Sequence, residues 1–166
     1  AGDLDAVREL KTEVIAGSFS EFLRTDEVRG EIDDVCSREA VQRMIRENLV
    51  LIAERGEEAV AIGALKADGA IFSCYSKGAR AGTAIVLELI DQALRKGSPV
   101  RCWIYSGNLL SKDLFSDFGF RDTGRRHRSS AAPRVPVEHW ELPDHSLVDQ
   151  KSAWHHGQSL TSDSDG

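Results

Sequence analysis

Residues 77–83 hold the residue types best suited to ligand binding, because small residues are interspersed there with two cations, Lys77 and Arg80. Gly78 and Gly82 let the backbone turn tightly, so that consecutive N–H groups can point into one concavity. A helix that begins there would add the positive end of its dipole, and this combination binds phosphate groups. The segment lacks the Gly-Lys-Ser/Thr ending of a P-loop and the third glycine of a dinucleotide-binding fingerprint. Taken alone, it is better interpreted as a polar turn.

Cysteine and tyrosine side chains are candidates for nucleophilic and proton-transfer chemistry. Cys36, Cys74 and Cys102 are odd in number and widely spaced, which argues against a disulfide framework or a zinc site and fits a reducing compartment. A thiol nucleophile needs a partner base, and neither Cys74 nor Cys102 has a histidine nearby in the sequence, so both are predicted to be small core residues. Tyr105 ends an apolar stretch and is the candidate for proton transfer, although an ordinary strand aromatic fits the pattern better.

Cations concentrate in residues 121–134, the sharpest local charge feature of the chain. Such a run is usually a solvated face. The net charge of −6 and the lack of interleaved aromatic residues argue against nucleic acid as a partner. The histidine pair 155–156 lies in a polar stretch and is expected to be solvated, so no metal site is predicted.

Hydrophobic periodicity predicts the elements that would position these residues. Helices are expected at 3–16, 37–47, 84–96 and 108–118, with a helical or irregular stretch at 17–30. Strands are expected at 49–54, 59–67, 70–75, 100–105, 120–128 and 135–142, with a hairpin signal at Asp68-Gly69. Helix 84–96 crosses between strands 70–75 and 100–105, so these two strands should be parallel neighbours. The predicted fold class is α+β, with a mixed, mostly antiparallel sheet flanked by helices.

Two of these helices carry residue-level predictions. Ser37 is expected to cap helix 37–47, and Ile45 is expected to face inward. Leu110, Leu114 and Phe118 recur at helical spacing and are expected to form the inward stripe of helix 108–118.

Length and composition indicate one soluble domain. The periodic pattern occupies residues 1–142, and residues 143–166 form a polar tail that is expected to be flexible. No apolar run approaches the length of a membrane span and no secretory signal is visible, so a cytoplasmic location is expected.

Two stretches carry further information in this order of elements. Residues 79–84 read ARAGTA, and residues 108–120 read Asn-Leu-Leu-Ser, then Leu-Phe-Ser-Asp-Phe-Gly-Phe at their end. They resemble two motifs of the GNAT superfamily of acyl-CoA-dependent N-acyltransferases, namely Gln/Arg-x-x-Gly-x-Gly/Ala after the fourth strand and Asn-x-x-Ala followed by Leu-Tyr-x-x-x-Gly-Phe. Ala79 replaces the expected Gln or Arg, and Arg80 is displaced by one place. The resemblance covers residues 49–142; the family's first strand has no counterpart before the first helix, so a missing upstream strand or domain is expected.

The resemblance implies that acetyl-CoA or another acyl-CoA is a co-substrate. Strands 70–75 and 100–105 would splay apart around the pantetheine arm, and backbone amides of residues 80–84 would hold the pyrophosphate, with charge added by Arg80 and Lys77. The residues implied to contact the donor are Cys74, Tyr75, Ser76, Arg80, Ala81, Gly82, Thr83, Ala84, Asn108, Ser111 and Phe115. Because the last two strands border the acceptor site in this family, Arg125, Arg126 and Arg128 become candidates for binding an anionic acceptor or a partner.

Two departures from the family pattern leave the activity open. Phe115 stands where many members have the tyrosine that protonates the leaving thiolate, and strand 70–75 carries no carboxylate that could act as general base. An amine can still react with a thioester, because the thiolate is a good leaving group and proximity lowers the barrier. One hypothesis is therefore an N-acyltransferase, with acetyl as the expected group, acting on a primary amine of a small molecule or protein. The other is a non-catalytic GNAT-like domain for CoA binding, regulation or interaction; a homodimer is compatible with both, and no membrane partner is expected.

Overall fold

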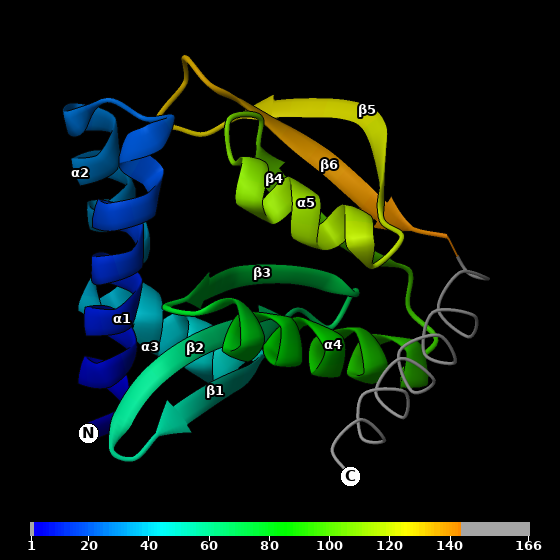
Figure 1. Ribbon diagram of the computed structural model, residues 1–166, viewed down its shortest axis with the longest axis horizontal. Coiled ribbons are helices and arrows are strands. Elements are labelled where there is room, and N and C mark those ends of the chain that lie inside the picture. Colours follow the sequence, from blue (N-terminus) through cyan, green and yellow to red (C-terminus); the bar gives the residue numbers. More distant parts are fainter. Residues whose placement is uncertain (1, 144–166) are drawn as a thin grey trace, which may run out of the picture.

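The computed structural model describes residues 2–143, so the predicted flexible tail lies outside the described residues except for Pro143. The chain forms, in order, α1 (Gly2–Ser18), a 3-10 turn η1 (Phe19–Glu21), α2 (Thr25–Val35), α3 (Arg38–Glu47), β1 (Leu49–Arg55), β2 (Glu58–Leu65), β3 (Ala70–Ser76), α4 (Ala79–Arg95), β4 (Val100–Tyr105), α5 (Leu109–Asp117), β5 (Arg121–Arg128) and β6 (Pro136–Leu142) (Figure 1). None of the described helices is long and apolar enough to span a bilayer.

Within residues 2–143 the strands form one six-stranded sheet in the order β1-β2-β3-β4-β6-β5. The described pairs are antiparallel except β3 with β4, which run parallel on either side of the α4 crossover. This confirms the predicted α+β class and the predicted parallel pair. β3 and β4 are paired at only two positions, Ala70 with Arg101 and Ile71 with Cys102, and separate toward their C-terminal ends.

A β-bulge in β3 accompanies this separation. Ile62 pairs with Tyr75 and Ala64 pairs with Phe72, so two residues of β3 lie opposite the single residue Gly63. The bulge includes Ser73, whose φ of 51° is uncommon for a residue with a side chain. A bulge bends its strand and increases the local twist, which turns β3 away from β4.

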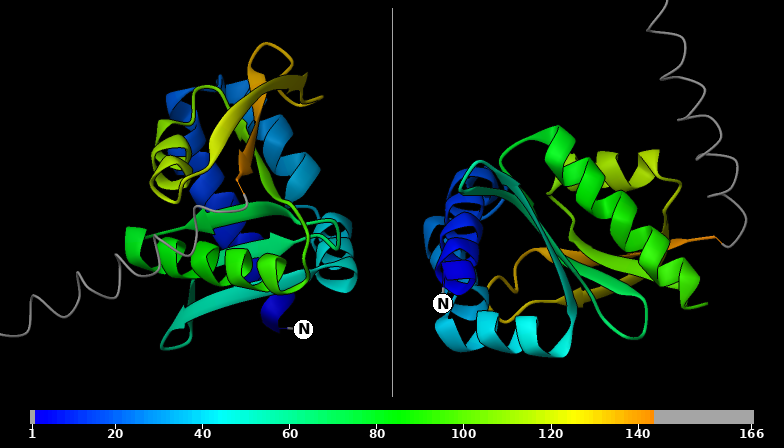
Figure 2. Two further views of the ribbon diagram at one scale, coloured as in Figure 1. Left: turned by 90° about the vertical axis from the view of Figure 1, so that its right-hand side faces the viewer. Right: turned by 90° about the horizontal axis from the view of Figure 1, so that it is seen from below.

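Helices cover both faces of the sheet. In the right-hand view of Figure 2, α1 and α3 lie on one side of the strands, and α4 and α5 lie on the other. The α4 and α5 face buries the larger cluster, in which Leu89, Ile90 and Phe115 pack against residues of β2, β3 and β4. The opposite face buries two smaller clusters, which contain Val7 and Leu10 in one case and Ile15 and Phe19 in the other. The place where β3 and β4 separate therefore lies inside the sheet, between the two helical layers.

Gly63 shows how closely α4 packs on this sheet. A Cβ atom at Gly63 would lie 2.6 Å from a methyl carbon of Ile85 and 2.7 Å from one of Leu89. The absence of a side chain at this position therefore lets α4 approach the bulged part of the sheet.

Three local predictions are wrong. The helix predicted at 84–96 begins at Ala79, because Gly78 provides an extended N-cap and ends the turn early. Ile45 is 39 % exposed, since α3 buries Val41 and Met44 and the next residue turns to solvent. Leu110 is 70 % exposed, because α5 buries Phe115 and leaves its first turn, Leu109 and Leu110, in contact with solvent.

Other predictions at this level are confirmed. Ser37 caps α3, with its hydroxyl accepting a hydrogen bond from the N–H of Ala40 at 3.2 Å. The ambiguous stretch 17–30 contains the 3-10 turn and the first half of α2, which begins at Thr25.

Candidate active site

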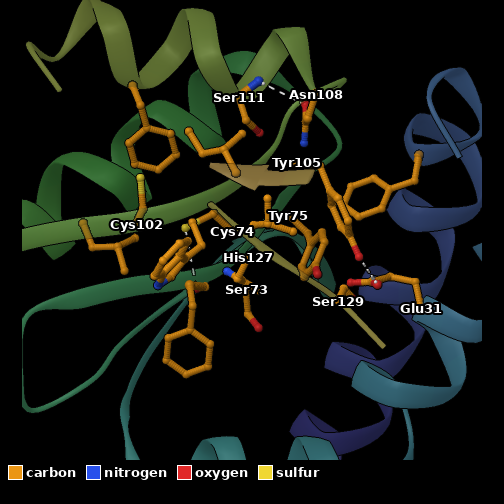
Figure 3. Close-up of a pocket in the computed structure, with 17 residues that line it drawn as sticks. Glu31, Ser73, Cys74, Tyr75, Cys102, Tyr105, Asn108, Ser111, His127 and Ser129 are labelled. Carbon is orange, nitrogen blue, oxygen red and sulfur yellow. Dashed lines mark hydrogen bonds between the residues drawn. The ribbon is translucent and has the colours of Figure 1, made fainter. Parts of the chain in front are cut away.

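The separation of β3 from β4 opens a cavity of about 330 Å³, which we call the strand cavity. Residues of β3, β4 and α5 line it, and Figure 3 shows Asn108 and Ser111 entering from one side and Ser73 and His127 from the other (Figure 3). A second cavity of about 420 Å³, the α4 cavity, lies between the start of α4 and the start of α5. The two cavities share the following lining residues: Phe19, Cys74, Tyr75, Asn108, Ser111 and Phe115. A ligand in one cavity can therefore reach into the other.

The turn between β3 and α4 presents free backbone donors to the α4 cavity. The hydroxyl of Ser76 donates to the carbonyl of Gly78 and accepts from the N–H of Gly78 at 3.0 Å. The N–H of Gly82 already donates to the carbonyl of Gly78 at 3.2 Å, and the following amides continue the helical ladder. The N–H groups of residues 79–81 have no intrahelical acceptor. Of the predicted backbone donors, residues 80–84, only the N–H groups of Arg80 and Ala81 therefore remain free of a helical acceptor.

The two cations of this turn differ in their surroundings. Lys77 forms ion pairs with Glu13 at 2.8 Å and Glu58 at 2.6 Å. These carboxylates accept its hydrogen bonds and raise the pKa of Lys77 above its usual range. Lys77 therefore links α1, β2 and the turn, and its charge is compensated. Arg80, in the first turn of α4, is left as the cation available to a phosphate.

Tyr105 and Glu31 form a buried polar pair at the α2 end of the strand cavity. The Tyr105 hydroxyl donates a hydrogen bond of 2.6 Å to a carboxylate oxygen of Glu31, as Figure 3 shows. Glu31 is 8 % exposed, and burial raises its pKa although the hydrogen bond from Tyr105 opposes the rise. Burial and the same hydrogen bond raise the pKa of Tyr105. The strand cavity therefore contains a carboxylate that can gain or lose a proton nearer neutral pH than an exposed glutamate.

Sequence reasoning did not identify Glu31. It lies three residues after Val28 and one before Ile32, on the side of α2 whose apolar residues pack inward. An acid on the apolar stripe of a helix was the available signal, but 74 positions separate it from Tyr105 in the sequence.

A buried lysine lies behind this pair. Lys11 is 2 % exposed, and its ammonium donates to the carbonyl of Val35 at 2.6 Å and lies 5.7 Å from the centre of the Tyr75 ring. Burial lowers the pKa of Lys11, against the attraction of Cys36 and Glu31. Lys11 therefore places positive charge near the Glu31 carboxylate.

Comparison with solved structures identifies the fold. No family model and no curated protein sequence matches the chain. A GCN5-related N-acetyltransferase from Rhodopseudomonas palustris is similar over 84 % of this chain and 88 % of its own, with a TM-score of 0.73 and 14 % identity. The PaiA N-acetyltransferase from Thermoplasma acidophilum, solved in complex with coenzyme A, is similar over 84 % and 92 %, with a TM-score of 0.67 and 16 % identity. A ribosomal-protein-alanine N-acetyltransferase from Brucella melitensis is similar over 84 % and 93 %, with a TM-score of 0.58 and 18 % identity. This chain has the GNAT fold.

The second GNAT-like stretch forms the start of α5. Asn108 caps the helix, with its side-chain oxygen accepting from the N–H of Ser111 at 3.2 Å, and both residues line the strand cavity and the α4 cavity. Phe115 is 4 % exposed and packs edge-on against Phe120 at 5.0 Å, so it forms an apolar wall without a hydroxyl. Phe115 therefore cannot donate a proton to a ligand in either cavity.

The cysteines of the strand cavity are poor nucleophiles. Burial raises the pKa of Cys74 to about 12 and raises that of Cys102 well above its ordinary value. Cys102 is also 2 % exposed, which confirms its predicted role as a core residue. Within residues 2–143 no group of His, Cys, Asp and Glu side chains is arranged to hold a metal ion.

The arginines of β5 divide between the two faces of the sheet. Arg126 forms an ion pair with Asp122 at 2.7 Å, and Arg128 donates to the carbonyls of Pro133 and Arg134. Arg125 lies over the ring of Trp103, which lines the strand cavity, at 5.4 Å. Of the three predicted anion-binding arginines, only Arg125 is thus placed next to the cavity.

Proposed function

We propose that this chain transfers an acyl group, acetyl in the first instance, from acyl-CoA to a primary amine. The observation that carries the proposal is the junction of the two cavities at Cys74 and Tyr75. A thioester donor in the α4 cavity would present its carbonyl carbon to an amine in the strand cavity. The PaiA N-acetyltransferase, which shares the fold, was solved with coenzyme A, and this supports the choice of donor.

The donor would be held mainly by backbone groups. The N–H groups of residues 79–81 point out of the start of α4, where the helix dipole also favours negative charge. Arg80 would add attraction to the pyrophosphate. The bulged end of β3, which is unpaired with β4 beyond Ile71, leaves backbone groups near Cys74 and Tyr75 free for the amides of a pantetheine arm.

Acyl transfer requires the amine to lose a proton as its nitrogen attacks the thioester carbonyl. We assign the Glu31 carboxylate as the group that receives this proton, either through the Tyr105 hydroxyl or through a water molecule. The C–S bond then breaks, and the thiolate is protonated by solvent because Phe115 cannot donate a proton. Positioning of the two reactants in joined cavities supplies much of the rate.

The buried pair of Glu31 and Tyr105 favours an acyltransferase over the hypothesis of a non-catalytic CoA-binding domain. A buried carboxylate with a raised pKa inside a cavity is costly to the fold, and such groups cluster at functional sites. A domain that only held CoA would have no use for a proton acceptor on the side of the sheet away from α4.

The test combines binding with turnover. Calorimetric titration with CoA should show binding for the wild type and for Glu31→Gln, because Glu31 lies outside the α4 cavity. Thiol release from acetyl-CoA with a panel of primary amines should occur with the wild type and fall by about 100-fold or more in Glu31→Gln, the usual scale of general-base catalysis. Asp33→Asn, which changes an exposed acid on the same helix, is the matched control and should retain activity.

The proposal fails in either of two ways. If the wild type does not bind CoA at millimolar concentration, the donor assignment is wrong. If it binds CoA but releases no thiol with any amine, the non-catalytic hypothesis replaces the acyltransferase.

A further inference from the structure

The mouth of the strand cavity opposite Glu31 is aromatic and cationic. Trp103 remains 37 % exposed, and its ring lies 4.4 Å from that of His127 and 5.4 Å from the guanidinium carbon of Arg125. Trp103 and His127 both line the cavity, and Figure 3 shows His127 on the side away from Asn108 and Ser111. A ligand that enters from this side therefore meets a flat ring with a positive charge over it.

Arg125 carries the uncompensated charge at this mouth. The neighbouring Arg126 is neutralised by Asp122, and Arg134 forms an ion pair with Glu27 at 2.7 Å. Arg125 forms no ion pair with any carboxylate among residues 2–143. Its guanidinium is therefore free to bind an anion, and arginine on an aromatic face suits a carboxylate because both groups are planar.

A buried histidine, His139, packs against the Trp103 ring that lies under Arg125. The Thr123 hydroxyl donates to the carbonyl of His139 at 3.0 Å, so at its 2.8 Å contact with the ring its oxygen accepts a hydrogen bond from the Nδ1–H group. The same hydroxyl accepts from the N–H of Arg125 at 3.3 Å. The His139 ring lies 4.5 Å from that of Trp103 and is 0 % exposed, and burial lowers its pKa. A neutral His139 thus supports Trp103 and the Arg125 backbone without adding a second positive charge.

The two ends of one small cavity therefore differ in charge. The Glu31 and Tyr105 pair lies at one end, and Arg125 and His127 lie at the other. A volume of about 330 Å³ is near the lower limit for small-molecule sites and too small for a folded segment of protein. Such a cavity complements a small molecule that has an amine at one end and an anion at the other.

We propose that the acceptor is a small amine that also carries a carboxylate, with the amine toward Glu31 and the carboxylate bound by Arg125 over Trp103. This inference rests on the proposed function, because it names the acceptor of the same reaction. Among primary amines, the proposal therefore favours amino-acid-like molecules over amines without an anionic group. It also disfavours polyamines, because their second cation would lie against Arg125.

A kinetic experiment compares matched acceptors. Thiol release from acetyl-CoA is measured with β-alanine against β-alaninamide, and with L-phenylalanine against L-phenylalaninamide. The acid of at least one pair should have a kcat/KM about tenfold or more above its amide, the scale of one charge-assisted hydrogen bond. At neutral pH the less basic amine of the amide is unprotonated to a greater extent than that of the acid. The intrinsic reactivity of the amines therefore favours the amide and works against this result.

Variants locate the effect. Arg125→Gln should remove the preference for the acid and leave the amide rate nearly unchanged. Arg121→Gln removes the same charge from the same exposed strand and should keep the preference. Equal kcat/KM for acid and amide in the wild type, or an equal loss in both variants, would overturn the inference.

A binding measurement separates this inference from the proposed function. The indole N–H signal of Trp103, assigned by its loss in Trp103→Phe, is followed by NMR during titration with each acid and amide. The acids should shift this signal at lower concentration than the amides, whether or not any acceptor is acetylated. No shift by either acid, or the same response to acid and amide, rejects the carboxylate site even if other amines are acetylated.

Discussion

Replacing Tyr105 with phenylalanine removes the hydroxyl that donates to Glu31 in the core of the candidate site. The lost bond is 2.6 Å long and ends on Glu31, which is 8 % exposed, so the carboxylate would remain buried with one partner fewer. A hydrogen bond to a charged group contributes about 1.5–3 kcal/mol. For a chain of this size that corresponds to a fall in Tm of roughly 3–12 °C at neutral pH.

Tyr75 provides a matched control in the same cavity. Its hydroxyl makes no hydrogen bond to any residue in the described part of the chain, although its ring packs in the same aromatic cluster. Tyr75→Phe should therefore unfold within about 0.5 kcal/mol of the wild type, as substitutions that break no specific interaction do. Thermal unfolding followed by circular dichroism gives both values.

A double-mutant cycle tests the cause. If the Tyr105 hydroxyl stabilises the fold through Glu31, then Tyr105→Phe should cost about 1 kcal/mol less in a Glu31→Gln background. A Tyr105→Phe protein with the Tm of the wild type would refute the reasoning, as would equal costs for Tyr105→Phe and Tyr75→Phe.

Three further predictions concern packing, the donor turn and pH. Gly63→Ala should lower the free energy of unfolding by about 1–3 kcal/mol in denaturant titrations, because its Cβ would lie 2.6 Å from a methyl of Ile85. Gly82→Ala should leave the free energy of unfolding nearly unchanged, because the higher helix propensity of alanine, about 1 kcal/mol, offsets the 3.0 Å contact of its Cβ with the Ser76 Cβ. Calorimetry should nevertheless show weaker CoA binding, because the added methyl group lies where the ligand would approach the backbone. Glu31→Gln should have the wild-type Tm at about pH 4 and a higher Tm than the wild type at neutral pH. The reason is that the pKa of Glu31 is raised in the folded protein, so the wild type loses stability as the pH rises through that pKa. An unchanged Tm difference across this pH range would count against a raised pKa of Glu31.

Much of the fold could be predicted because its signals are local. The helix crossing between 70–75 and 100–105 fixes a parallel pair, and the Asp68-Gly69 turn fixes an antiparallel one. The cap at Ser37 was also predictable, since it depends on residues three positions apart.

The polar and aromatic groups of the strand cavity were not predictable in the same way. Glu31 became a candidate because it is buried and hydrogen-bonded to Tyr105. Trp103 became a candidate because Arg125, which lies across β6, sits over its ring. These contacts arise from tertiary packing. The basic run likewise looked uniform in sequence, whereas pairing of β5 with β6 gives Arg125 and Arg126 different partners.

The extra residue in β3 makes the strand cavity depend on chain length as well as on residue identity. Between the paired positions Phe72 and Tyr75, β3 is one residue longer than β2 needs for an unbroken ladder. A descendant that lost Ser73 could pair β3 continuously with both neighbours, which would gain main-chain hydrogen bonds and close the strand cavity. One residue of β3 therefore separates the chain with an open cavity from one with a continuous sheet. The strand cavity thus depends on the length of β3, separately from the identity of any residue in it.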